Sequence, residues 1–477
     1  MSFSLITNSL LFKKVVGNKV FRNFSYLTIG TLLSQLLSLI SILRITRLLS
    51  PSEYGVFTFL NAQGALLFVI GSLGTSSVFI RTIARDSSQT KNLVYNGLKL
   101  RTSALLLTCS LYLIYNNLFG SLSTGQLFLV FAFSLVNAFF SLAENVFYGY
   151  QMMLTPSLIS LIYSFSWLIV VYSVSQDVIN VTVLFYLFLL LNALKTFFYL
   201  FFLKKQKLLS GSVSGFIGTS KRLFKESRPY FMMVLILLPI SSFSSNFLDI
   251  NSDIKEVGYY NLSARTIGPI FLVISSVYAA IFPNLSSLWD RDKNQFNKAI
   301  SIGVSFFFLF TLALCFLFNL FAKEIVVLLF PHSYLPAVEV CKMQIWHIFL
   351  TSVDSLIGTI LGAANREKLI LRFAILYFIV STPIFFYGSK FGAFGLSCGY
   401  VISFSICMLY VWNTFTKVLE VKVKHSTILW CAAVVLFLMG YFIPSDFFVG
   451  YKILISMLVI SLVGVYSYRL YPLIALK

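Results

Sequence analysis

Residues 299–321 read AISIGVSFFFLFTLALCFLFNLF, a run of 23 residues without Asp, Glu, Lys or Arg. A helix needs about 20 mostly apolar residues to cross a bilayer, so this run predicts a membrane span. The rest of the chain is similar, since 58% of its 477 residues are hydrophobic, 11% are charged and the mean hydropathy is +0.88. Soluble domains carry about 25% charged residues. The composition therefore predicts an all-α integral membrane protein with very little room for a soluble domain.

About fourteen such runs follow one another along the chain. They lie near 24–48, 55–80, 102–120, 125–148, 153–174, 179–203, 229–248, 257–284, 299–321, 342–362, 369–388, 391–415, 427–443 and 449–469. The first run follows a basic N-terminal segment, is long enough to span and has no signal-peptidase site after it. We therefore expect a retained first helix, not a cleaved signal peptide.

The 36 Lys and Arg residues are distributed unequally between the two sides that these runs define. On one side, 27 of them lie in the termini and alternate loops; seven lie on the other side, and Lys195 and Arg265 fall within spans. The net charge of +20 would suggest nucleic acid in a soluble protein. Here it fits the positive-inside rule, with some attraction for anionic lipid head groups. This asymmetry places both termini in the cytoplasm.

The segment 204–228 is the longest polar stretch and carries seven basic residues. Its sequence SGSVSG at 210–215 suggests a flexible linker, although an ordinary basic loop would look the same. The predicted organisation is an N-terminal six-helix bundle at 1–203, a basic cytoplasmic linker at 204–228, a C-terminal six-helix bundle at 229–415 and two additional helices at 416–477.

A short motif recurs at equivalent points of the two predicted bundles. Glu53-Tyr-Gly55 opens the second span of the first bundle, and Glu256-Val-Gly258 opens the second span of the other, 203 residues later. Two large apolar or aromatic residues follow each glycine. Parallel repeats related by an axis along the membrane normal would produce this pattern.

Several motifs resemble those of one transporter family. RLLSPSEYGVF at 47–57, GSLG at 71–74 and RTIA at 81–84 resemble the opening of polysaccharide exporters of the Wzx type. Later helix junctions of that family are similar to YGYQ at 148–151, to Asp249 together with EVGYY at 256–260, and to FGAFG at 391–395.

The resemblance implies the MATE-like fold of the MOP superfamily, with two six-helix bundles around a central cavity. It also implies a transporter that flips a lipid-diphosphate-linked oligosaccharide, such as an O-antigen or capsule repeat unit, across a bacterial inner membrane. Membrane lipids, a polysaccharide polymerase and a chain-length regulator are the partners that such a role suggests.

Two cations lie within predicted spans and are candidates for binding the substrate. Arg265 lies eight residues into the span near 257–284, four residues before Pro269, and Lys195 lies at a similar depth in the sixth span. A charge at the centre of a span costs at least about 2.5–3.5 kcal/mol, so it usually faces a cavity or a partner. Arg and Lys can bind a diphosphate through charge-assisted hydrogen bonds. Lys195 could instead extend its long side chain to the membrane surface.

Three acids are candidates for ion coupling or for structural pairing. Asp354 lies near the middle of the tenth span, where it could pair with Arg265 or titrate in a cycle coupled to H+ or Na+. Glu144 is a few residues from the cytoplasmic end of the fourth span, which favours a role near the membrane surface. Asp249 closes the seventh span.

Four further polar residues are candidates for lining a substrate pathway. Arg44 and Arg47 end the first span, where anchoring to lipid head groups is the alternative. Asn61 and Gln63 lie in the second span, where polar contacts between helices would explain them equally well.

No motif indicates catalysis, a metal or a cofactor. The six cysteines form no CxxC pair, and the three histidines are far apart. The alternatives are a MATE-like multidrug extruder, which would favour an acidic cavity, and a membrane-embedded oligosaccharide polymerase or glycosyltransferase. The D-x-D sequence at Asp290–Asp292 lies in a short basic loop and is better explained as a solvated helix end.

Overall fold

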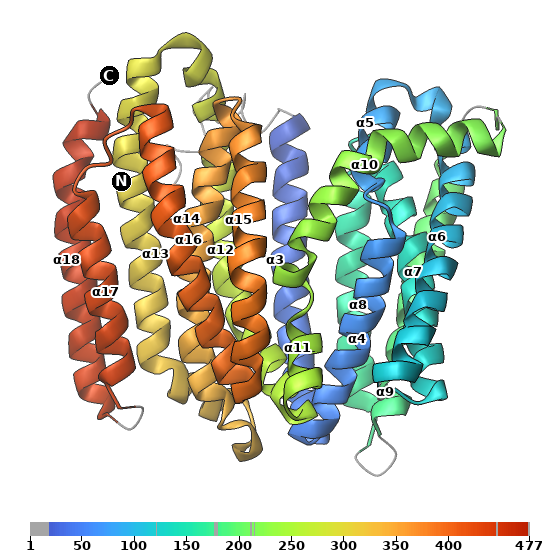
Figure 1. The fold of residues 1–477 in the computed structure, drawn as a ribbon, viewed down its shortest axis with the longest axis horizontal. Helices are drawn as coiled ribbons and strands as arrows, with labels where there is room; N and C mark the ends of the chain where they lie inside the picture. Colours follow the sequence, from blue (N-terminus) through green and yellow to red (C-terminus); the bar gives the residue numbers. More distant parts are fainter. Residues whose placement is uncertain are drawn as a thin grey trace, which may run out of the picture. The chain divides into compact units, whose positions relative to one another are not determined.

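The computed structural model describes residues 19–120, 122–175, 180–209, 212–213, 215–444 and 447–475. Lys13 and Lys14 of the basic N-terminal segment, and residues 210, 211 and 214 of the Ser/Gly stretch, lie outside these ranges. The elements are α3 (Lys19–Leu48), α4 (Pro51–Gly71), α5 (Ser76–Arg85), η1 (Ser87–Gln89), α6 (Thr90–Phe119), α7 (Thr124–Gly149), α8 (Leu154–Ser173), α9 (Val181–Lys205), α10 (Phe216–Ser241), α11 (Ser244–Asn251), α12 (Ile254–Arg291), α13 (Lys293–Leu329), η2 (His332–Tyr334), α14 (Ala337–Ala363), α15 (Glu367–Gly388), η3 (Ser389–Phe391), α16 (Gly392–Leu419), α17 (Ser426–Phe442) and α18 (Val449–Ala475). The prediction of an all-α fold is confirmed (Figure 1).

The chain forms two compact units. Unit 1 comprises the described parts of Met1–Leu49 and Val56–Leu235, and unit 2 comprises Ser50–Gly55 and the described parts of Ile236–Lys477. The first turn of α4 therefore belongs to unit 2, whereas the rest of that helix belongs to unit 1. α10 is divided in the same way at Leu235.

Unit 1 is built around α7, which packs against α5, α6 and α9, while α3 packs along α8. Its core contains Phe79, Val146, Phe147 and Tyr199, and the rings of Phe147 and Tyr199 meet edge to face at 5.8 Å. The first part of α10 lies across the ends of other helices of this unit (Figure 1). Residues 216–228 of the predicted linker are therefore helical.

Unit 2 is built around α14, which packs against α12, α13 and α16. The two additional C-terminal helices, α17 and α18, pack mainly against α13. Phe308 of α13 contacts Phe349 of α14 and Trp430 of α17, with ring centroids 5.0 and 4.9 Å apart. Aromatic packing of this kind joins the additional helices to the rest of the unit.

Side-chain capping explains where α4 and α16 begin. Ser50 and Glu53 exchange hydrogen bonds at the start of α4, since the Ser50 N–H donates to Glu53 Oε2 and the Glu53 N–H donates to Ser50 Oγ. This reciprocal pattern satisfies two backbone donors at a helix start. Glu256, the equivalent residue of the repeat, instead accepts the N–H of Ala393 in the first turn of α16 (2.9 Å).

The two glycines of the repeated motif face each other. A Cβ atom on Gly55 would collide with the carbonyl of Ile254, and one on Gly258 would collide with the carbonyl of Pro51. The starts of α4 and α12 therefore cross backbone against backbone, which only glycine allows at such close range. The motif found in the sequence thus marks a contact within unit 2.

Within the described residues, ten helical stretches are long and apolar enough to cross a membrane, or eleven if α10 and α11, bent by 48°, form one span. The sequence predicted about fourteen. Three features account for the difference: the stretch Glu367–Leu419 contains two helices, α15 and α16, that pack against each other, α17 is only 17 residues long, and α12 is not among the ten stretches. The chain is therefore a multi-pass membrane protein with several compact or broken spans.

Candidate functional site

Arg265 lies on α12 with an exposed side chain. Among the described residues no carboxylate forms an ion pair with it. Its charge acts on the hydroxyl of Tyr54, a buried residue in the first turn of α4. The guanidinium is thus a cation that is accessible and not neutralised by a described acid.

Asp354 and Arg265 do not form the ion pair that one alternative predicted. Asp354 lies on α14 and is partly buried, and its Oδ1 accepts a hydrogen bond from the Tyr377 hydroxyl of α15 at 3.0 Å. The carboxyl group is thus held by a neutral donor. Asp249 lies on α11, is also partly buried and forms no ion pair with any described residue.

Lys195 and Glu144 lie close together in unit 1. The Lys195 Nζ is 4.0 Å from the ring centroid of Phe140 and 4.9 Å from that of Tyr163, and it interacts electrostatically with Glu144. Glu144 accepts hydrogen bonds from Tyr148 at 3.0 Å and from Tyr199 at 3.5 Å. Cation–π contacts and a nearby carboxylate stabilise this lysine inside the bundle.

Arg44 and Arg47 end α3 in different environments. Arg44 is partly buried, with its guanidinium carbon 5.8 Å from the ring centroid of Tyr172, and its Nε has no hydrogen-bond partner in the described part of the chain. Arg47 is exposed in the last turn of the helix. A cation at that position is favoured by the helix dipole.

Asn61 and Gln63 lie near the middle of α4. Gln63 is fully buried, and its Oε1 accepts a hydrogen bond from Tyr112 of α6 at 3.0 Å. This hydrogen bond is a polar contact between helices, which was the alternative to a place in the substrate pathway for Gln63. Asn61 is partly buried.

Arg101 is a buried cation that lies just before the predicted span at 102–120. It lies on α6, is 0% exposed, and donates to the hydroxyls of Thr75 (2.8 Å), Ser76 (3.0 Å) and Ser141 (3.4 Å). Its guanidinium also lies 5.1 Å from the ring centroid of Phe79. The cluster of small hydroxyl residues at 75–76 was the signal that could have indicated a buried donor.

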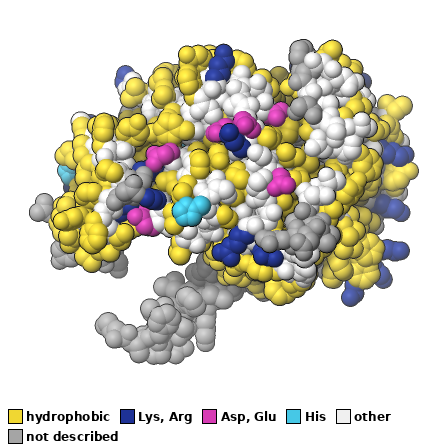
Figure 2. Space-filling model, turned by 90° about the horizontal axis from the view of Figure 1, so that it is seen from below, with side chains coloured by type: hydrophobic (Ala, Val, Ile, Leu, Met, Phe, Trp, Pro, Cys, Tyr) yellow, Lys and Arg dark blue, Asp and Glu magenta, His cyan; other side chains and the backbone are white. Residues whose placement is uncertain are grey.

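At the end of the molecule seen in Figure 2, acidic side chains lie among basic ones. Lys255 pairs with Asp253 and Lys342 with Glu339, each at 3.3 Å. The N–H of Lys255 donates to Asp253 Oδ1 (3.1 Å) and lowers the pKa of that carboxyl. No group of three or more described His, Cys, Asp or Glu residues could hold a metal ion.

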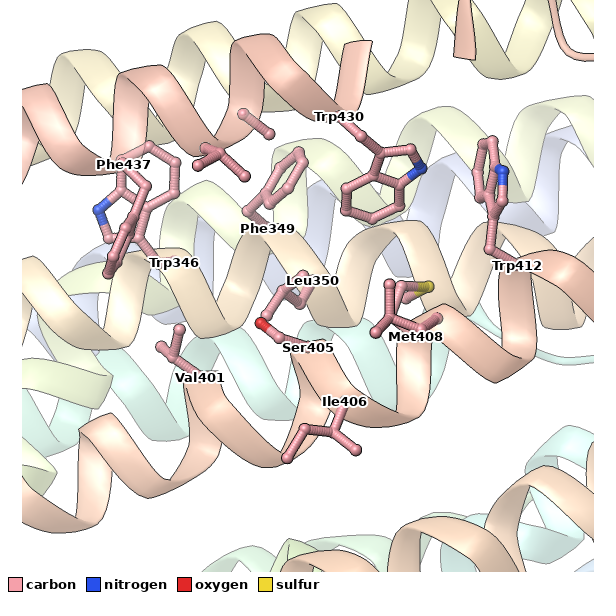
Figure 3. Close-up of a pocket in the computed structure, with 13 residues that line it drawn as sticks. Trp346, Phe349, Leu350, Val401, Ser405, Ile406, Met408, Trp412, Trp430 and Phe437 are labelled. Atoms are coloured by element: carbon pink, nitrogen blue, oxygen red, sulfur yellow. The ribbon is translucent and has the colours of Figure 1, made fainter. Parts of the chain in front are cut away.

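A second kind of site is an apolar pocket of about 440 Å³ inside unit 2, between α14, α16 and α17 (Figure 3). Tryptophans 346, 412 and 430 line it together with Phe349, Phe437 and Met408. The hydroxyl of Ser405 is the only polar side-chain group among the lining residues apart from the indole N–H groups.

Comparison with solved structures defines the fold class. A lipid II flippase MurJ in an inward closed conformation matches 93% of this chain and 98% of its own length, with a TM-score of 0.70 and 17% identity. An inward-facing multidrug resistance MATE family transporter of the MOP superfamily matches 82% of this chain and 96% of its own (TM-score 0.63, 15% identity). A MOP superfamily transporter from Pyrococcus furiosus matches 84% and 96%, respectively (TM-score 0.54, 16% identity). The chain therefore has the MATE-like fold that the resemblance implied.

The family follows from the sequence itself. The model of the polysaccharide biosynthesis protein family matches residues 20–289, which is more than half of the chain. The chain therefore belongs to the polysaccharide biosynthesis protein family. No curated protein sequence matches it significantly.

Proposed function

We propose that this chain flips a lipid-diphosphate-linked oligosaccharide, such as an O-antigen or capsule repeat unit, from the cytoplasmic to the outer leaflet of a bacterial inner membrane by alternating access. Arg265 carries this proposal, because its side chain is exposed on a helix of the bundle and pairs with no described acid. Membership of the polysaccharide biosynthesis family supports a saccharide substrate. No catalytic step is required.

The physical requirement is to move a diphosphate through about 30 Å of hydrocarbon. An unpaired charge in hydrocarbon is costly, so the transporter must supply compensating cations along the way. An arginine is always charged and can bind two phosphate oxygens at once. Arg265 in unit 2 and Arg44 in unit 1 are the cations that we assign to this role, with Arg47, Lys195, Asn61 and Gln63 as weaker candidates.

A MATE-like extruder of cationic drugs is the second candidate, and it would need accessible acids. Asp354 is the acid that could serve such a site, but Tyr377 already donates to it, and Glu144 lies beside Lys195. The exposed side chain of Arg265, which pairs with no described acid, is the observation that favours an anionic substrate. Asp354, Glu144 and Asp249 remain our candidates for coupling to H+ or Na+.

The remaining proposals concern topology, organisation and partners. We place both termini and the 204–228 segment in the cytoplasm, keep the division into 1–203, 204–228, 229–415 and 416–477, and expect a polysaccharide polymerase and a chain-length regulator to act with this protein. The excess of basic residues on one side supports this orientation. Labelling of a cysteine at position 213 by an impermeant reagent from outside intact cells would contradict it.

The substrate proposal is tested with Arg265→Ala, Arg265→Lys and the control Lys390→Ala, which removes an exposed cation from η3. Surface polysaccharide and protein level are measured in cells that lack the wild-type gene. We expect Arg265→Ala to abolish export at a normal protein level, Arg265→Lys to retain part of it, and Lys390→Ala to retain nearly all. Full export by Arg265→Ala, or by Arg265→Ala with Asp354→Ala, would contradict diphosphate binding.

A further inference from the structure

The apolar pocket of unit 2 has an aromatic pair at each end (Figure 3). At one end the rings of Trp412 and Trp430 meet edge to face with centroids 5.4 Å apart. At the other end Trp346 and Phe437 meet in the same way at 5.4 Å. These pairs join α17 to α16 and to α14, and the pocket lies in the space between them.

The rim of the pocket is formed by side chains that face outward from the bundle. Ile406 and Leu409 of α16 are 50% and 77% exposed, and Val434 of α17 is 56% exposed. α16 lies in a stretch that is long and apolar enough to cross a membrane, and α17 is an apolar helix of 17 residues. At that depth the surrounding medium is lipid hydrocarbon, so lipid chains have direct access to the pocket.

The lining has no group that would hold a charged or strongly polar ligand. Apart from the indole N–H groups and the Ser405 hydroxyl, every lining side chain is apolar. Apolar cavities stay dry and bind apolar molecules. A head group would leave its charges without partners here, whereas a hydrocarbon chain would contact aromatic rings on several sides.

We propose that this pocket binds one acyl chain of a bilayer phospholipid, which enters between α16 and α17 while its head group stays outside. The volume of about 440 Å³ is near the lower end of the range of about 300–1,000 Å³ for ligand pockets. That capacity fits part of one acyl chain better than the long lipid of a saccharide carrier. The chain would fill the gap that α16 and α17 leave between their aromatic pairs. The proposal does not depend on the substrate of the transporter.

Tryptophan fluorescence offers a direct test, because three of the five tryptophans line the pocket. The full chain is reconstituted into nanodiscs of phosphatidylcholine with or without bromine on the acyl chains. Brominated chains quench tryptophans that they contact. Trp346 is 3% exposed, so chains reach it through the pocket.

Ala433→Phe fills the pocket from α17, and Ala432→Phe is the matched control on the same helix, since only Ala433 lines the pocket. We expect Ala433→Phe to reduce bromine-dependent quenching by about half, because three of five tryptophans lie there, and Ala432→Phe to leave it nearly unchanged. If Ala433→Phe does not fold, Ser405→Leu fills the pocket from α16.

A second arm identifies the source of the chain. Excess unbrominated phosphatidylcholine should relieve the quenching, whereas an equal amount of an isoprenoid phosphate should not relieve it further. Equal quenching in the wild type and both filling variants would overturn the proposal. Selective relief by the isoprenoid phosphate would overturn the assignment to a phospholipid. The outcome of the quenching experiment leaves the export test unaffected, since the export test measures surface polysaccharide.

Discussion

Two buried cations, one in each unit, are stabilised in different ways. In unit 2 the Lys452 ammonium is 1% exposed and donates to Glu324 Oε1 at 2.6 Å. In unit 1 the Arg101 guanidinium is fully buried and donates to three hydroxyls, and no described carboxylate forms an ion pair with it. The Glu324 carboxylate neutralises the charge of Lys452, whereas only neutral hydroxyl groups stabilise the charge of Arg101.

The difference follows from the geometry of the two side chains. A lysine presents a compact point charge, so one carboxylate at close range offsets much of the cost of burial. An arginine spreads its charge over a planar fork with five donors, so several neutral acceptors can replace the water that it loses. A buried cation therefore does not by itself indicate a missing acid or a binding site.

The largest expected effect is that of Glu324→Ala. This change leaves the Lys452 ammonium buried without its carboxylate. Breaking a fully buried pair costs about 3–5 kcal/mol of folding free energy, and because the Glu324 side chain is 33% exposed we expect a loss near the lower end of that range. The thermal unfolding midpoint in one fixed detergent should fall clearly. Combining Glu324→Leu with Lys452→Met should recover most of the loss, because no buried charge remains. A midpoint unchanged by Glu324→Ala would show that this pair does not stabilise unit 2.

An intermediate effect is expected for Arg101→Met. It removes hydrogen bonds from a charged donor, worth about 1.5–3 kcal/mol each before compensation, but it also removes a buried charge without an ionic partner. We expect a net loss of about 1–3 kcal/mol in the same unfolding measurement. Arg101→Lys should be no more stable than Arg101→Met, because it keeps the charge and loses the fork. A clearly more stable lysine variant would contradict the role assigned to the fork.

The smallest expected effect is that of Arg81→Met. Arg81 pairs with Glu226 at 2.8 Å, but the two side chains are 40% and 37% exposed. Pairs this exposed contribute about 0–1 kcal/mol, so the unfolding midpoint should shift little, and less at high salt. A loss as large as that of Arg101→Met would show that the exposed pair holds α10 against α5 more strongly than its exposure suggests.

The sequence was sufficient for the fold because membrane helices are specified by composition over about 20 residues. Residues 299–321 illustrate this, since they all lie within α13. The boundaries were harder, because α10 begins at Phe216 inside a basic segment. Its first part is amphipathic: Leu223 and Ser227 are buried, whereas Lys221 and Lys225 are exposed. A hydropathy average does not detect that pattern.

The candidate site was predicted less completely. Depth along a helix singled out Arg265, which the structure places on α12 with an exposed side chain, but it could not show whether a partner lay opposite. It therefore left the Arg265–Asp354 pair open, and the structure shows Tyr377 beside Asp354 instead. Arg101 was missed because it lies just before the predicted span at 102–120, whereas α6 begins at Thr90 and contains it. Partners on other helices depend on tertiary packing, which hydropathy does not encode.

The crossing of α4 and α12 is symmetric in its close contacts. Gly55 approaches the carbonyl of Ile254, and Gly258 approaches that of Pro51. Pro51 and Ile254 are themselves related by the same offset of 203 residues as the two glycines. Each copy of the motif therefore contacts the other through the same atoms, as the two subunits do in an isologous interface. A side chain at either glycine would therefore meet the same obstacle, a carbonyl oxygen of the other helix, so the two positions should tolerate substitution equally poorly.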